Sequence, residues 1–111
     1  MAAHEGYLAG VEQWRLLQEK WARLDGDARM LEEMQKSLLA ELTNQYAAGN
    51  SVAKAEVMAR SHERYLEHVR KMVQARTEAN IAKSYADAKK MGWESWRSAE
   101  ATRREEAKLI R

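Results

Sequence analysis

The sequence predicts an all-α protein built as a long antiparallel helical hairpin of the coiled-coil type. Three observations predict this class. The chain has no proline and only five glycines. Ala, Glu, Lys, Leu and Arg supply 62 of its 111 residues, a composition typical of long helices and coiled coils. Apolar residues also recur every three and four positions, a period that keeps one face of a helix turned toward a partner.

The first helix is predicted over residues 5–46. Its apolar stripe consists of Tyr7, Trp14, Leu17, Trp21, Leu24, Ala28, Leu31, Leu38 and Leu42, with Gly10 and Gln35 at the two remaining positions. Gly26 lies inside this helix, where glycine costs about 1 kcal/mol relative to alanine. Because Leu24 and Ala28 stay in phase across it, we expect the helix to be continuous.

A turn is predicted over residues 47–51. Gly49 can take the left-handed conformation that ends a helix, and Asn50 or Ser51 can cap the helix that follows. Two helices joined by so short a connection fold back on one another.

The second helix is predicted over residues 52–110, longer than the first, with Gly92 as a possible break. Its stripe begins with large residues, including Met58, His62, Tyr65 and Val69, and continues with small ones, Ala75, Ala79, Ala82 and Ala86. The predicted hairpin core is Trp14, Leu17, Trp21, Leu24, Leu31, Leu38, Tyr65, Val69, Ala75, Ala79, Ala82 and Ala86.

A turn centred on Gly49 also predicts the register of the hairpin. Leu31 then lies near His68–Val69, and the indole of Trp14 faces Tyr85–Ala86, inside the alanine part of the second stripe. Bulky residues that face small ones fill the space between helices without voids.

Composition also bears on assembly and location. Besides 19 alanines the chain has only 31 large apolar residues, so we expect other copies to cover part of its surface, as a homo-oligomer. Residues 1–51 carry a net charge of −3 and residues 52–111 a net charge of +5, which suits head-to-tail association or an acidic partner. With no leader-like start and no apolar run of bilayer length, the chain is expected in the cytoplasm, away from membranes.

No constellation of residues predicts catalysis. His62 and His68 are six residues apart, whereas a helical zinc pair requires four. The neighbouring carboxylates Glu32-Glu33 and Glu105-Glu106 point about 100° apart on a helix and cannot converge on a substrate. We therefore expect no enzyme activity, no cofactor, no metal and no small-molecule substrate.

The candidate contact site lies near the end of the second helix, beyond the expected end of the hairpin. Its residues are Trp93, Trp96, Arg97, Arg103, Arg104 and Lys108. From Glu94 onward we expect no partner within the chain. Two interpretations are open: indoles beside cations can stack single-stranded bases, or they can anchor a subunit interface, where Trp and Arg are enriched.

The second half of the chain resembles small helical proteins of tailed bacteriophages over residues 55–109. The matching segments are Ala59-Arg60-Ser61, Tyr65, His68, Glu78-Ala79-Asn80 and the run from Glu94 to Glu105. The resemblance implies a phage-encoded protein of the host cytoplasm, accessory to DNA metabolism, since some such proteins are oligomeric mediators of DNA recombination.

The expected function is that of a non-enzymatic, self-associating helical adaptor that binds single-stranded DNA or a DNA-metabolism protein. The alternative is a protein-only interaction module, either an inhibitor of a host protein or a structural component of a virion.

Overall fold

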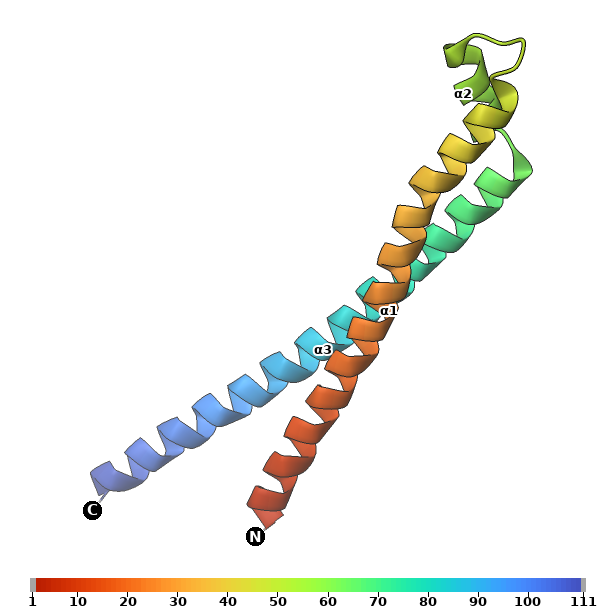
Figure 1. The fold of residues 1–111 in the computed structure, drawn as a ribbon. Helices are drawn as coiled ribbons and strands as arrows, with labels where there is room; N and C mark the ends of the chain where they lie inside the picture. The colour runs from red at the N-terminus through yellow and green to blue at the C-terminus, as the bar shows by residue number, and fades with distance from the viewer. Residues whose placement is uncertain (1, 111) are drawn as a thin grey trace. The chain divides into compact units, whose positions relative to one another are not determined.

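A computed structural model describes residues 2–110 of the chain, with side chains from Gly6 to Ile110. It contains α1 (Ala2–Tyr46), α2 (Val52–Arg60) and α3 (Glu63–Ile110) and no strand within residues 2–110 (Figure 1). The predicted all-α helical hairpin is therefore confirmed. Over the same residues, no helix has a stretch long and apolar enough to cross a membrane.

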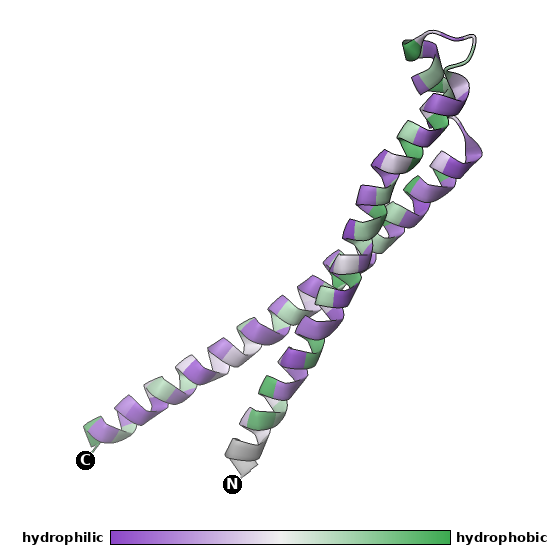
Figure 2. Ribbon diagram, in the orientation of Figure 1, coloured by the Kyte–Doolittle hydropathy of each residue, from purple (hydrophilic) through white to green (hydrophobic). Residues whose placement is uncertain are grey.

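The chain forms two compact units. Unit 1 contains Met1–Trp21 and Ile81–Arg111, and unit 2 contains Ala22–Asn80. Each unit includes one segment of α1 and one segment of α3, and unit 2 also includes α2. Hydrophilic and hydrophobic residues alternate along every helix (Figure 2), as expected for helices that each bury a single face.

The connection after α1 is a tight turn. Gly49 has a φ of 77°, a left-handed conformation that glycine adopts without steric cost. The side-chain amide of Asn50 donates to the carbonyl oxygen of Tyr46 at 2.9 Å. The hydroxyl of Ser51 accepts a hydrogen bond from the Lys54 N–H at 3.2 Å and so caps α2.

The prediction of one helix over residues 52–110 is wrong, because the chain breaks at Ser61 and His62. The Ser61 hydroxyl donates to the Val57 carbonyl oxygen at 2.9 Å, and the His62 N–H donates to Ala59, three residues back. The Nδ1 atom of His62 then accepts from the Arg64 N–H at 3.0 Å and caps α3. By contrast, α3 passes through Gly92 without a break.

In unit 2, α1 and α3 pair in the predicted register. The Nε2 atom of His68 donates to the carbonyl oxygen of Leu31 at 2.7 Å. One turn of helix away, the side-chain amide of Gln35 donates to the hydroxyl of Tyr65 at 2.9 Å. The predicted proximity of Leu31 to His68–Val69 is confirmed.

The core consists almost entirely of small side chains. The buried residues are Ala28, Leu42, Ala55, Ala59, Ala79, Ala82 and Ala86. Of the predicted core, Ala79, Ala82 and Ala86 are buried, whereas Trp14, Leu17, Trp21, Leu24, Leu31, Leu38, Tyr65, Val69 and Ala75 are half-buried. The buried Ala55 and Ala59 of α2 were outside the predicted core.

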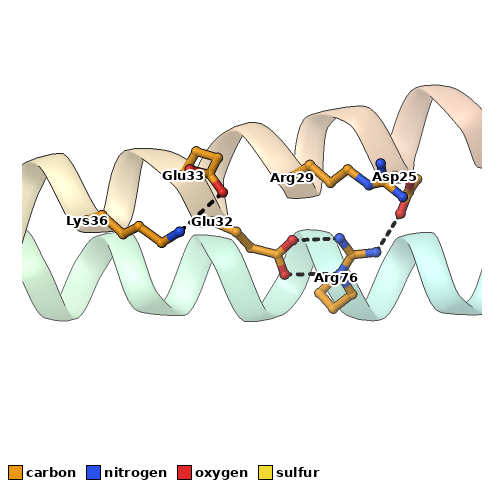
Figure 3. Close-up of polar contacts among 6 residues, drawn as sticks. All are labelled: Asp25, Arg29, Glu32, Glu33, Lys36 and Arg76. Carbon is orange, nitrogen blue, oxygen red and sulfur yellow. Dashed lines mark hydrogen bonds and ion pairs between the residues drawn. The ribbon is translucent and has the colours of Figure 1, made fainter.

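An arginine of α3 links two acids of α1 in unit 2 (Figure 3). The Arg76 guanidinium donates to both carboxylate oxygens of Glu32, at 2.6 and 3.2 Å, and to Asp25 at 2.7 Å. Asp25 also pairs with Arg29 at 2.9 Å. The hydrogen bond from Arg76 lowers the pKa of Glu32 from its ordinary value, so the charge of Arg76 is neutralised within its own unit.

Candidate nucleic-acid interface

In unit 1 an aromatic cluster packs between α1 and α3; it consists of Tyr7, Trp93 and Trp96. The ring of Tyr7 lies 5.6 Å from Trp93 and 6.3 Å from Trp96, measured between centroids. The expectation that α3 lacks an intrachain partner from Glu94 onward is therefore wrong, because the packing stripe of α3 continues through Trp96. Every side chain from residue 101 to residue 110 is exposed.

A row of basic side chains runs along α3 beside these aromatic residues. Lys83, Lys90, Arg97 and Arg104 are seven residues apart, so they share one face of the helix at intervals of about 10.5 Å. We call these four residues the cation row. Two of them lie over indoles: the Lys83 Nζ is 5.8 Å from the ring of Trp21, and the Arg97 Cζ is 5.4 Å from the ring of Trp93.

The remaining members of the row are unpaired. Within residues 6–110, neither Lys90 nor Arg104 forms an ion pair or a side-chain hydrogen bond. Lys90 lines a small cavity of about 160 Å³ together with Tyr7, Val11, Trp14 and Trp93. The row thus presents positive charge that the described part of the chain does not neutralise.

Two polar groups are buried without a partner in the same region. The indole N–H groups of Trp14 and Trp93 reach no acceptor among the described residues. An unsatisfied buried donor costs about 1–3 kcal/mol.

The structure places the six predicted contact residues in different surroundings. Trp93, Arg97 and Arg104 belong to the cation row or touch it. Arg103 lies about 100° away from Arg104 on the helix and pairs with Glu100 at 2.8 Å. Lys108 pairs with Glu105 at 3.3 Å. Trp96 lies against Tyr7.

Lys83 and Lys90 were not among the predicted contact residues, because the predicted site began at Trp93. Their spacing of seven residues from Arg97 was the signal that would have found them, since equal heptad positions share a face.

Beside Tyr7, Trp93 and Trp96, unit 1 has an open groove of about 450 Å³. We call it the glycine groove; it is lined by Gly6, Tyr7, Gly10, Ala88, Lys89, Gly92, Trp93, Trp96 and Glu100. A Cβ atom added at Gly6 or Gly92 would meet no atom within 4 Å, and at Gly10 it would lie 3.9 Å from Trp93. Contacts within the chain therefore do not require these glycines, which leave the groove open.

No group of three metal-ligating side chains converges anywhere in the described part of the chain. No protein-family model, curated protein or solved structure matches the sequence.

Proposed function

We propose that this chain is a non-enzymatic, self-associating helical adaptor whose cation row binds the phosphate backbone of single-stranded nucleic acid. The observation that carries the proposal is the set of unneutralised basic side chains at Lys83, Lys90, Arg97 and Arg104. Basic grooves combined with aromatic side chains are the usual means by which proteins bind single strands.

Two half-buried indoles hold side chains of the cation row in place. Trp21 and Trp93 lie under Lys83 and Arg97, and a cation over an indole face is held by electrostatic attraction. The long basic side chains are thereby ordered before a ligand binds, which reduces the entropy lost on binding. In this proposal the indoles position the cations, and the cations contact phosphate.

The width of the row favours one strand over a duplex. Asp87 and Glu94 follow Lys83 and Lys90 by four residues on the neighbouring part of the helix surface. These acids border the row on one side, about 40° around the helix, so the row is a track one side chain wide. A flexible single strand can follow such a track, whereas the two backbones of a duplex are separated by grooves about 6 and 12 Å wide.

Tryptophan fluorescence during titration with a short oligothymidylate tests the proposal. Binding at about 50 mM salt should weaken with a logarithmic salt slope of about −3, because four phosphate contacts on a single strand each contribute about −0.7. Lys90→Glu combined with Arg104→Glu should abolish binding. The matched control, Lys20→Glu combined with Lys54→Glu, makes the same change in net charge on α1 and α2 and should retain it.

The absence of salt-dependent binding, or equal losses in the two double variants, would refute this role. A place beside DNA recombination fits the resemblance of residues 55–109 to phage proteins, which is an analogy at the level of the family.

The second candidate is a protein-only interaction module. Three large apolar side chains of α3 favour it, since Met91, Leu109 and Ile110 are 66%, 85% and 87% exposed. That candidate predicts that the cation-row variants leave partner binding unchanged.

A further inference from the structure

We propose that a second, exposed stripe on α3 binds the same stripe of a second copy of this chain in antiparallel orientation. The inference rests on the proposed function in one respect only, the self-association of the chain. It assigns the surface, the partner and the direction of the pairing.

The stripe follows the spacing of a helix-packing seam. It consists of Ile81, Tyr85, Ala88, Gly92, Ser95, Ala99 and Thr102, which alternate by four and three residues, and every one of them is exposed. We call this set the outer stripe. At 3.6 residues per turn it lies about 110° from the buried stripe that contains Ala82 and Ala86, so this part of α3 has two separate faces suited to pack against helices.

The outer stripe is free of charge in a chain of which 32% is charged. Between residues 79 and 102, α3 carries Lys83, Asp87, Lys89, Lys90, Glu94, Arg97 and Glu100. All seven lie in the remaining arc of the helix surface. Because burying an unpaired charge is costly, a charge-free face three heptads long is what a helix interface requires.

The glycine groove extends this face toward α1. Ala88 and Gly92 belong both to the outer stripe and to the groove. Packed helices approach to 8–10 Å when the side chains between them are small, and the open space beside Gly6 and Gly92 permits such an approach. The groove therefore leaves open space beside the outer stripe in which a third helix can pack, with Lys89 and Glu100 among its lining residues.

The distribution of side-chain size identifies the occupant as another copy of α3. The large residues Ile81 and Tyr85 are at one end of the stripe, 52% and 65% exposed, whereas the other end has Ala99 and Thr102. Antiparallel pairing about Gly92 sets Ile81 against Thr102 and Tyr85 against Ala99 of the second copy, so large side chains meet small ones. Parallel pairing would instead oppose Tyr85 to Tyr85.

A two-fold symmetric pair uses the same surface on both copies and closes on itself. It also leaves the proposed nucleic-acid track accessible. The cation row lies about 180° from the outer stripe around α3. Two copies would display two rows, and linked sites bind a strand that can reach both more tightly than one site does.

Sedimentation equilibrium of the full chain tests the surface. We expect twice the 12.8 kDa chain mass at a concentration of about 100 µM, ample for a complex with a micromolar Kd. Ala88→Glu should give the mass of one chain, because it buries a charge in the interface. Ala101→Glu, at an exposed alanine of α3 outside the stripe, should leave the dimer intact, with circular dichroism verifying equal helicity.

A wild-type chain that is monomeric at that concentration, or an Ala88→Glu variant that is still dimeric, overturns the inference. The outcome is separate from that of the nucleic-acid proposal. Failure of oligonucleotide binding leaves the mass unchanged, and Ala88→Glu should retain salt-dependent binding per chain while losing dimerisation.

The orientation can be tested by cross-linking because the chain has no cysteine. An oxidised mixture of Tyr85→Cys and Ala99→Cys chains should form a mixed disulfide, which requires Cα atoms about 4.4–6.8 Å apart. Each variant alone should stay uncross-linked. A disulfide between two Tyr85→Cys chains would overturn the antiparallel arrangement.

Discussion

Gln35 of α1 donates a hydrogen bond to the hydroxyl of Tyr65 of α3, 2.9 Å away. Both side chains are half-buried, and this bond joins polar groups that occupy packing positions on the two helices. A polar pair at such positions favours one register, because a shift along the helix would leave each group against apolar neighbours.

Removing both members of this pair should cost less than the sum of removing each one alone. Tyr65→Phe should destabilise the chain by about 0.5–1.5 kcal/mol, since Gln35 loses its acceptor. The double variant Gln35→Leu with Tyr65→Phe should be less destabilised than the sum of the single variants. Urea unfolding of all four chains in a double-mutant cycle measures the coupling, and additive effects would contradict the role of this bond.

Stability should depend on pH through Glu32. The hydrogen bond from Arg76 lowers the pKa of Glu32 in the folded chain, so folding is favoured by the ionised form. This contribution is present above the ordinary carboxyl pKa and is lost as the pH falls through the lowered value. The difference in melting temperature between wild type and Glu32→Gln should therefore shrink as the pH falls from about 7 toward about 3.

The same comparison in an Arg76→Met background supplies the control for Glu32. With the guanidinium gone, Glu32→Gln should change the melting temperature little at either pH. An unchanged pH dependence in that background would assign the effect to another group.

Leu42→Ala should be the most damaging truncation of a leucine. Leu42 is the largest fully buried side chain, and deleting such a leucine costs about 2–5 kcal/mol through lost burial and the cavity left behind. Leu66→Ala removes the same atoms at a position 42% exposed, so its cost should be about 1 kcal/mol or less. Urea midpoints monitored by circular dichroism compare the two, and equal losses would contradict this account of the core.

Two glycines should respond oppositely to alanine. Gly26 lies within α1 with no atom within 4 Å of an added Cβ, so Gly26→Ala should stabilise the chain by about 0.5–1 kcal/mol through helix propensity. Gly49 has a φ of 77°, which disfavours a side chain, so Gly49→Ala should destabilise it by about 1 kcal/mol. Melting temperatures that shift in the same direction for both would refute this distinction.

The hairpin could be predicted because the apolar pattern that specifies it repeats along the sequence. One period of three and four residues over the length of α1 determines a face, and Gly49 then determines the register that His68 and Leu31 display. The division at Ser61 and His62 has no comparable signal. It depends on short-range hydrogen bonds of Ser61 and His62, and neither residue is a strong helix breaker, so the apolar pattern gave no indication of it.

The candidate site was predicted only in part, because the role of a cation depends on what faces it across the hairpin. Arg76 is seven residues before Lys83 and has the same helical position, yet it meets Asp25 and Glu32 and is neutralised. Lys83 meets the indole of Trp21, and its charge stays unpaired. Spacing along α3 alone does not separate these two cases; the residues of α1 do.

Three different surfaces share about five and a half turns of α3 between Ile81 and Glu100: the stripe against α1, the cation row and the outer stripe. Few residues in this stretch belong to none of the three surfaces. By contrast, the side chains of residues 101–110 are all exposed. A saturation mutagenesis screen should therefore tolerate the fewest replacements between residues 81 and 100, although the largest buried side chain, Leu42, is elsewhere. In this protein the number of substitutions that a helix tolerates would then depend more on how many surfaces contact it than on how deeply its side chains are buried.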